Sequence, residues 1–558
     1  MTIDAFAELF EPADLHVAQR LSALGQDSDD RVALAIALAV RAVRSGSVCV
    51  DLRSVAEQVG VPELPWPQPR EWREAVAASP LADRHVLRLY SDGDADLLYL
   101  DRYWREEQQV CDDVLALLSA PPRATVPNLN RLFPAGWEEQ RAAADAALRQ
   151  PLTVLTGGPG TGKTTTVARL LAAVAEQADI AGTAPPRMAL AAPTGKAAAR
   201  LADAVAAEVG KLADVDKTRL SGLRATTLHR LLGSRPDTSS RFRHHRGNRL
   251  PHDVIVVDET SMVSLTMMAR LLEAVRPGAR LLFVGDPDQL ASVDAGAVLA
   301  DLVDGLGSSG VVELQTSHRF GETIGALAQA IRGGDADATV DLLRAGGDAV
   351  AWLDTDDASD ALREPLTDRA AQLREAALLG DAGTALGILD SHRLLCAHRN
   401  GPYGVTHWNR RVERWLSDRT GQSMWSQWYP GRPLLVTAND YGLGVYNGDT
   451  GVVVAAPDGL RAHVGPLRFA PGRLGDVDTM FAMTIHKSQG SQADEVTVLM
   501  PPEDSRLLTR ELFYTAVTRA KKRVHVVGTE ASVRAAVGRR ATRASGLARR
   551  LRRRRAQK

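Results

Sequence analysis

The sequence predicts an α/β protein with two doubly wound domains and smaller parts attached, and three observations lead to this prediction. Short branched or leucine-rich runs alternate with helical stretches from about residue 140 to residue 527. Such runs are typical of strands buried in a parallel sheet, and each leads into a glycine-rich or polar loop. Ligands of open α/β sheets bind at these loops. At 558 residues the chain is also long enough for three or four domains.

Residues 1–118 are predicted to form a small, mainly helical domain. Helical periodicity covers residues 31–44, with Asp30 as its candidate N-cap and Gly46 after its end. Two apolar runs, residues 87–90 and 97–100, flank a turn and predict a β-hairpin. This segment carries no catalytic pattern.

Residues 119–335 are predicted to form the first α/β domain, which follows a linker at Pro121 and Pro122. Each of its expected buried strands ends in a polar or glycine-rich loop. These strands are residues 152–156, 188–192, 254–257 and 281–284, and a small insertion is expected at about residues 234–252.

Residues 336–534 are predicted to form the second α/β domain, with a β-rich insertion at about residues 430–478. Its expected strands are residues 394–397, 495–499 and 523–527, and those of the insertion include 432–437 and 450–454. Residues 535–558 form a basic C-terminal tail with an unbroken arginine run at 552–555. We expect this tail to be disordered and solvated rather than a specific DNA site.

Charge and cysteine content narrow the classes of protein that fit. The net charge is −1, from 67 Lys and Arg against 68 Asp and Glu, so any contact with DNA must come from local placement of charge. The three scattered cysteines, Cys49, Cys111 and Cys396, argue against a disulfide framework, a zinc ribbon or an iron–sulfur cluster. We expect them to be buried apolar residues.

Targeting signals are not recognisable in the chain. The longest apolar stretch, residues 32–40, is too short to span a membrane. Nothing near Met1 resembles a signal peptide. The sequence therefore predicts a cytoplasmic protein that does not bind membranes.

A phosphate-binding loop follows the first predicted strand and opens a helix, which is the context that this motif requires. Lys163 would reach the β- and γ-phosphates of ATP, and the hydroxyl of Thr164 would bind Mg²⁺. Glycines let backbone N–H groups turn inward on the phosphates, and the helix N-terminus favours an anion. The predicted nucleotide-binding residues here are Gly157, Gly158, Pro159, Gly160, Thr161, Gly162, Lys163, Thr164 and Thr165.

Two adjacent carboxylates, Asp258 and Glu259, end the apolar strand at residues 254–257. Burying charge there is costly, so packing is a poor explanation for them. Asp258 would hold Mg²⁺ and Glu259 would polarise the attacking water. Together with the phosphate-binding loop they predict NTP hydrolysis, but they do not show what the hydrolysis drives.

Further motifs identify a family. In chain order they are APTGKAAAR at 192–200, TLHR at 227–230, DETSM at 258–262, GDPDQL at 285–290, SHRF at 317–320, LLCAHRNGPYGVTHWN at 394–409, YNGD at 446–449, TIHKSQGS at 484–491, and YTAVTRA at 514–520. Their order and spacing resemble superfamily 1 helicases, and in particular the RecD family, the alpha subunits of RecBCD (exodeoxyribonuclease V) complexes. The resemblance runs from about residue 133 to residue 547, and is looser before it.

The resemblance implies a fold of two RecA-like P-loop NTPase motor domains, with a small SH3-like β-rich insertion in the second. It implies that Gln140 contacts adenine and that Gln289 senses the γ-phosphate. Arg319 and Arg519 would act as arginine fingers from the two domains. A cation supplied across a cleft stabilises transition-state charge only when the cleft closes, so hydrolysis becomes domain motion.

The resemblance also implies a path for DNA across both motor domains. Hydroxyl, imidazole and ammonium groups on phosphates give grip without sequence preference. The candidate contacts are Thr194, Lys196 and His229 on the first domain and Thr484, His486 and Ser488 on the second. For any one of them a structural role is as plausible as a DNA contact, whereas the set favours DNA.

Two other clusters of polar residues are weaker candidates for a site. The basic loop at 241–246 fits a DNA contact or a solvated turn equally well, and adjacent histidines such as His244 and His245 rarely form a metal site. Asp354, Asp356 and Asp357 are interpreted as an acidic surface loop rather than nuclease metal ligands. None of the eight lysines has a carboxylate two residues before it, which the nuclease fold of RecB-like subunits needs.

By resemblance, the chain is a 5′→3′ DNA helicase subunit without a nuclease site of its own. It would assemble with RecB-like and RecC-like subunits in a heterotrimer that unwinds and resects double-strand break ends for recombinational repair. The resemblance implies that residues 1–118 dock a partner. The alternative is that they form a small helical domain without a docking role. Two alternatives stay open: a stand-alone 5′→3′ helicase, and a regulatory subunit whose nucleotide site switches an interface.

Overall fold

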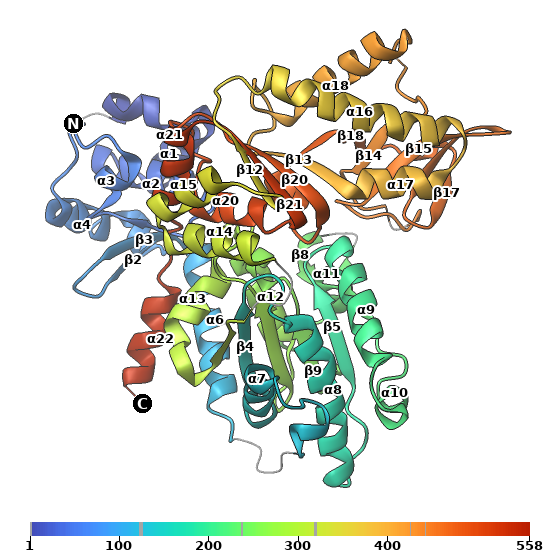
Figure 1. Cartoon of the computed structure of the whole chain (residues 1–558). Coiled ribbons are helices and arrows are strands. Elements are labelled where there is room, and N and C mark those ends of the chain that lie inside the picture. The colour runs from blue at the N-terminus through green and yellow to red at the C-terminus, as the bar shows by residue number, and fades with distance from the viewer. Residues whose placement is uncertain are drawn as a thin grey trace.

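The computed structural model of the chain describes residues 3–121, 127–235, 238–316, 321–424, 426–440 and 442–557. Two α/β lobes lie one above the other, with an N-terminal unit beside them and a β-rich unit projecting from the second lobe (Figure 1). The predicted α/β fold with two large parallel sheets is confirmed.

The first lobe is built on a six-stranded sheet whose strands all run parallel. Its order is β11-β4-β10-β9-β5-β6. The four strands predicted from the sequence form its centre. The bounds are β4 Leu152–Gly157, β5 Met188–Ala192, β6 Ala225–Thr227, β9 Val254–Val257, β10 Arg280–Gly285 and β11 Val311–Leu314.

Helices bury both faces of this sheet, which explains why its strands are apolar without alternation. Val254 and Val256 of β9 join the core on one face, and Ile255 and Val257 join the core on the other. The helices of the first face are α7 Glu138–Arg149, α8 Lys163–Ile180 and α9 Gly195–Val209. Those of the second are α6 Asp101–Leu118, α12 Leu265–Ala274, α13 Val298–Leu306 and α22 Leu547–Ala556. Smaller elements of the lobe are α10 Asp214–Arg219, α11 Leu228–Leu232, β7 Ser234–Arg235 and β8 Thr238–Phe242.

The second lobe has a five-stranded parallel sheet in the order β12-β21-β20-β13-β19. Its strands are β12 Val350–Leu353, β13 His392–Cys396, β19 Ala482–Thr484, β20 Ala493–Leu499 and β21 Ala520–Val527. Its helices are α14 Glu322–Gly333, α15 Ala336–Ala345, α16 Ser359–Leu378, α17 Ala382–Ser391, α18 Val405–Thr420, α19 Ile485–Ser488, α20 Arg510–Val517 and α21 Glu530–Gly538.

The β-rich unit is inserted between α18 and β19 of the second lobe. Its five strands are all antiparallel, in the order β17-β16-β15-β14-β18. They enclose a core of their own that includes Leu434, Val453 and Val464. The strand bounds are β14 Pro433–Val436, β15 Thr450–Ala456, β16 Gly459–Val464, β17 Leu467–Phe469 and β18 Val477–Thr479.

The N-terminal unit is helical around one small antiparallel sheet, β1-β3-β2. The predicted hairpin is present, but the predicted cap at Asp30 is wrong, because Asp29 accepts the cap hydrogen bond from the backbone N–H of Arg31 at 2.9 Å. All three cysteines are buried, as expected. Besides α6, the elements are α1 Pro12–Gly25, α2 Asp30–Arg44, α3 Val55–Val59, α4 Pro69–Ala77, α5 Pro80–Asp83, β1 Val50–Asp51, β2 Leu87–Ser91 and β3 Asp96–Leu100. Among the helices of the described ranges, none combines the length and apolar character that a membrane crossing needs.

The expectation of a disordered C-terminal tail is wrong. Residues 547–556 form helix α22, which lies beside α13 and α6 (Figure 1). Leu547 and Leu551 are fully buried in the core of the first lobe. Arg550 pairs with Glu107 at 2.7 Å and lies 3.8 Å above the ring of Trp104. The arginine run hid this helix, because its acidic partners lie hundreds of residues away in the chain.

We expect Leu551→Ala to destabilise the first lobe by roughly 2–5 kcal/mol, since a fully buried leucine leaves a cavity when truncated. Urea unfolding of the full chain measures this change. The matched control is Leu379→Ala, whose side chain is 79% exposed and whose effect should stay within about 0.5 kcal/mol. Equal unfolding midpoints for the two variants would show that α22 is not packed on the lobe.

Candidate nucleotide site and the neighbouring groove

The loop between β4 and α8 has the backbone of a phosphate-binding loop. Gly160 and Gly162 adopt φ values of 85° and 86°, which residues with a Cβ rarely adopt. The helix begins at Lys163, so the N–H groups of its first turn face the loop. The ammonium of Lys163 donates to the carbonyls of Gly157 at 2.6 Å and Gly158 at 2.8 Å. A cation therefore stands where phosphate oxygens would bind.

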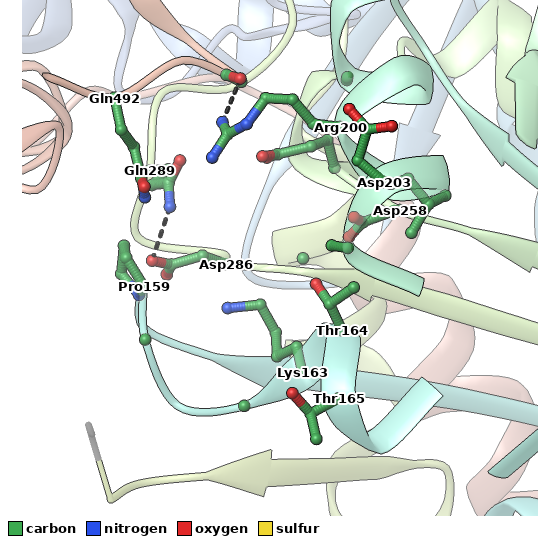
Figure 2. A pocket seen from close by; sticks show the side chains of 18 of the residues that line it. Pro159, Lys163, Thr164, Thr165, Arg200, Asp203, Asp258, Asp286, Gln289 and Gln492 are labelled. Atoms are coloured by element: carbon green, nitrogen blue, oxygen red, sulfur yellow. Dashed lines mark hydrogen bonds between the residues drawn. The ribbon is translucent and has the colours of Figure 1, made fainter. Parts of the chain in front are cut away.

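A cavity of about 840 Å³ opens beside this loop, between the two lobes. Figure 2 shows Lys163 pointing into it, with Asp286 and Pro159 on one side and Thr164 and Asp258 on the other. The predicted residues that line it are Gln140, Pro159, Gly160, Gly162, Lys163, Thr164, Thr165, Asp258, Glu259, Gln289 and Arg519.

The remaining loop residues, Gly157, Gly158 and Thr161, do not line the cavity but shape the loop. The hydroxyl of Thr161 is buried and donates to the carbonyl of Gly158 at 2.9 Å. Gln140 is also buried, and its amide lies 3.4 Å from the carbonyl of Thr161. Gln140 therefore contacts the loop as well as the cavity.

The two carboxylates predicted after β9 lie at the cavity wall. Burial raises the pKa of Asp258 to about 6, and the neighbouring charge of Glu259 adds to this rise. Glu259 has a left-handed backbone, with φ 50° and ψ 41°, which costs a non-glycine residue roughly 1–2 kcal/mol. The Asp258 carboxylate and the Thr164 hydroxyl are hard oxygen donors, which fit Mg²⁺, an ion that completes its shell with water and phosphate oxygens.

A chain of hydrogen bonds crosses the cleft between the lobes at this cavity. In the first lobe, the side-chain amide of Gln289 donates to Oδ2 of Asp286 at 3.1 Å. From the second lobe, the guanidinium of Arg519 donates to Oε1 of the same glutamine at 3.0 Å. Arg519 is 3% exposed, so this contact lies inside the protein. The predicted γ-phosphate sensor and one predicted finger are thus in direct contact.

Arg319, the other predicted finger, lies outside the described residues, as does the rest of residues 317–320.

The structure adds cavity residues that the sequence argument did not single out. Arg200 of α9 donates to the carbonyl of Gly490 in the second lobe (Figure 2). Asp203, Asp286 and Gln492 also line the cavity. Arg200 and Asp286 belong to motifs identified from the sequence. The sequence did not show that these two side chains lie near the phosphate-binding loop.

A second cavity, of about 450 Å³, lies in a groove that both lobes and the β-rich unit line. Five of the six predicted DNA contacts line it: Thr194, Lys196, His229, Thr484 and His486. Ser488 does not. Its side chain is 1% exposed, and its hydroxyl donates to the carbonyl of Ile485 at 2.7 Å.

The two lobes present threonines to the groove in the same way. Thr194 caps α9, and Thr484 caps α19, each accepting a backbone N–H at 3.2 Å. Thr227 does the same for α11 at 3.2 Å. A hydroxyl that accepts such a bond still has its own proton to donate. The caps can therefore bind an anion without giving up their structural role.

The basic groups of the groove have shifted pKa values. Burial lowers the pKa of Lys196 to about 8, and its ammonium donates to the carbonyl of Gly448 in the β-rich unit at 3.2 Å. Burial also lowers the pKa of His229 and of His486, which favours the neutral imidazole near pH 7. Neutral imidazoles can donate one N–H to a phosphate without adding charge.

The basic loop at 241–246 is tied to the protein at two points. Phe242 is buried, with its ring 5.7 Å from that of His229. Arg246 forms an ion pair with Asp113 of α6 at 2.9 Å. Neither histidine of the loop belongs to a metal-binding group, since no cluster of three or more His, Cys, Asp or Glu occurs within the described ranges.

Three family models match parts of the chain. The N-terminal domain of RecBCD enzyme subunit RecD matches residues 7–90. An AAA domain matches residues 137–354, and the UvrD-like helicase C-terminal domain matches residues 479–527.

Curated relatives match nearly the whole chain. RecBCD enzyme subunit RecD of Mycolicibacterium smegmatis is 70% identical over 552 residues, covering 99% of both chains. The protein of the same name from Mycobacterium tuberculosis is 67% identical over 98% of this chain and 95% of its own. The ATP-dependent RecD2 DNA helicase of Deinococcus radiodurans is 32% identical over 79% of this chain but only 56% of its own length.

Solved structures that resemble the chain include Pif1 helicase from Bacteroides in complex with ADP-AlF3 and ssDNA, at a TM-score of 0.39 and 17% identity. The alignment covers 70% of this chain and 91% of that one. Pif1 helicase from Candida albicans has a TM-score of 0.38 and 16% identity over 70% and 94% of the two chains. Both likenesses are distant.

We expect Gln289→Ala to lower the turnover of ATP hydrolysis by roughly 100-fold, because it removes the amide that joins Asp286 to Arg519 at the phosphate end of the cavity. Affinity for ATP should change little, since Lys163 and its loop stay in place. A steady-state phosphate-release assay measures turnover. As a control, Gln109→Ala removes an amide that donates to the Ala269 carbonyl far from the cavity, and turnover should be unaffected. Wild-type turnover in Gln289→Ala would contradict the role assigned to the bridge.

Proposed function

The chain belongs to the RecD family of RecBCD enzyme subunits, and from that premise we propose that it is an ATP-dependent DNA helicase, the motor subunit of a RecBCD-type complex. The observation that supports the motor most directly is the bridge from Arg519 through Gln289 to Asp286. It joins the two lobes at the wall of one cavity that also contains Lys163. A nucleotide in such a cavity would contact both lobes at once.

ATP would bind with its phosphates on the loop and Lys163, and with its adenine near Gln140. Thr164 and Asp258 would hold Mg²⁺, and the charge of the ion would offset that of the phosphates. Glu259 would take a proton from the attacking water. The oxygen of that water would form a bond to the γ-phosphorus while the bond from this phosphorus to the ADP oxygen breaks.

Arg519 would stabilise the charge that develops on the γ-phosphate, with Gln289 orienting it. Arg319, which lies outside the described residues, is proposed as the second finger. Once phosphate leaves, the attraction that holds the lobes together weakens, so chemistry becomes relative motion of the two lobes.

Single-stranded DNA would lie in the groove that both lobes line. Threonine hydroxyls, Lys196 and the histidines would hold its phosphates, and none of these groups distinguishes bases. Because the lobes grip through equivalent caps, Thr194 and Thr484, a change in their separation would move the strand by a step. Ser488 is left out of this set, since its hydroxyl is already bound to Ile485.

At the level of the complex, we propose RecB-like and RecC-like partners and a role in unwinding and resecting double-strand break ends for recombinational repair. The motor would move 5′→3′, and the nuclease would reside in a partner. The N-terminal unit would dock a partner, and the β-rich insertion would be SH3-like. A cytoplasmic location is also part of this proposal, since the DNA to be repaired would be chromosomal.

We expect Lys163→Gln to lower DNA-stimulated ATP hydrolysis by at least about 100-fold, because the ammonium that contacts the β- and γ-phosphates is lost. Phosphate release with and without single-stranded DNA measures this on the full chain. Co-purification of partner subunits should be unchanged, since Lys163 lies inside the cleft. Normal hydrolysis by this variant would refute the motor. A wild-type chain that purifies from its own cells as an active monomer would instead favour a stand-alone helicase.

The pKa of Lys196 predicts how DNA binding depends on pH. As the pH rises through about 8, the ammonium loses its proton and its attraction for phosphate. Affinity for a labelled single strand, measured by fluorescence anisotropy at constant ionic strength, should therefore fall between about pH 7 and pH 9. Lys196→Arg should remove most of this fall, because a guanidinium stays charged. Lys211→Arg, on the exposed surface, serves as the control and should keep the wild-type dependence. An identical pH profile for wild type and Lys196→Arg would contradict a phosphate contact at this residue.

A further inference from the structure

The hydroxyl of Tyr514 crosses from the second lobe to the phosphate-binding loop of the first. Tyr514 lies on α20, and its side chain is buried. Its hydroxyl donates to Oδ2 of Asp286 at 3.0 Å. A Cβ at Gly158 would lie 3.1 Å from the same hydroxyl oxygen, so the tyrosine also touches the loop. The mechanism described above uses none of these contacts.

Asp286 accepts three hydrogen bonds, and each comes from a different group. Oδ2 accepts from Tyr514 and, at 3.1 Å, from the amide of Gln289. Oδ1 accepts the backbone N–H of Asp288 at 3.1 Å. The tyrosine and the glutamine therefore share one carboxylate oxygen, and the position of that oxygen determines where the glutamine amide points.

The direction of the hydrogen bond from Tyr514 follows from the ionisation of the pair. Burial raises the pKa of Tyr514, and the charge of Asp286 raises it further, so the hydroxyl keeps its proton. Burial raises the pKa of Asp286, while the charge of Lys163 opposes that rise. A phenol that donates to a buried carboxylate makes a charge-assisted bond, which is stronger than one between neutral groups.

Neighbouring contacts show that the second lobe also holds the end of the segment at residues 286–290. The backbone N–H of Leu290 donates to the hydroxyl of Thr515 at 2.9 Å, and the amide of Gln489 donates to the Leu290 carbonyl at 2.7 Å. Tyr514, Thr515 and Gln489 all belong to the second lobe. Separation of the lobes would break these contacts together with the one from Arg519.

We propose that Tyr514 is a positioning residue for ATP hydrolysis. When the lobes are closed, its hydroxyl holds the carboxylate of Asp286 in place, and this carboxylate orients Gln289 so that the amide oxygen of Gln289 faces Arg519. The proposal rests on the function proposed above. Tyr514 touches no part of the substrate in this role. It acts through Asp286 and makes the orientation of Gln289 depend on the position of the second lobe.

Tyr514→Phe tests the proposal, because it removes one oxygen and keeps the ring. We expect the kcat for DNA-stimulated ATP hydrolysis to fall about tenfold or more, as loss of a hydrogen bond to a charged group implies, with the KM for ATP within about twofold of wild type. Tyr99→Phe is the matched control, since the hydroxyl of Tyr99 donates to the Glu107 carboxylate at 3.0 Å in a buried site outside the cleft. It should lower thermal stability to a similar degree and leave kcat unchanged.

A second comparison separates positioning from general stability. In an Asp286→Ala background, which has no acceptor for the hydroxyl, Tyr514→Phe should lower kcat no further, because the two residues act through one contact. Wild-type kcat in Tyr514→Phe, or full additivity with Asp286→Ala, would overturn the proposal. DNA-dependent hydrolysis by the wild type would still support the motor in that case. If the wild-type chain hydrolysed no ATP in the presence of single-stranded DNA, the proposed function itself would fail.

Discussion

Residues 286–290 of the first lobe form a cluster of contacts with the second lobe. Within them, the amide of Gln289 separates the buried carboxylate of Asp286 from the buried guanidinium of Arg519 while bonding to both. A charge taken out of water is costly unless it is paired or hydrogen-bonded. Opening the cleft would deprive Arg519 of Gln289, and Asp286 of the hydroxyl of Tyr514. Contact between the lobes therefore determines how Asp286, Gln289 and Arg519 are placed in the cavity that contains Lys163. The other residues of the site depend on this placement.

The groove and the nucleotide cavity are close in the chain as well as in space. At the start of α9, its cap Thr194 and Lys196 line the groove, and Arg200, little more than a helical turn after Lys196, lines the cavity. In the second lobe, His486 lines the groove and Gly490, which accepts the hydrogen bond of Arg200, lines the cavity. Short rigid segments thus connect both sites in each lobe. A DNA strand that moved the groove end of such a segment would therefore also move its cavity end.

Arginine side chains form ion pairs and stacking contacts between distant parts of this chain. The C-terminal helix is the strongest case, because its basic residues suggest a disordered, solvated tail in the sequence. Arg550 is instead buried against Trp104 and paired with Glu107, and Arg552 pairs with Asp304 at 2.5 Å. A planar guanidinium can stack on a ring and bond to a carboxylate at once, which an ammonium does less well. Helix α22 thereby joins the N-terminal unit to the first lobe.

The parallel strands, the phosphate-binding loop and the carboxylates after β9 could all be predicted from the sequence alone, because continuous apolar runs and the spacing from Gly157 to Thr164 are local properties. The sequence did not show that Tyr514 donates a hydrogen bond to Asp286 or that the hydroxyl of Ser488 donates to the carbonyl of Ile485 in its own turn. It also did not show that the C-terminal arginines belong to a packed helix. Those outcomes depend on which distant groups meet. Only the tertiary structure brings a donor within reach of a buried acceptor, and hydrogen bonds and ion pairs act only at that range.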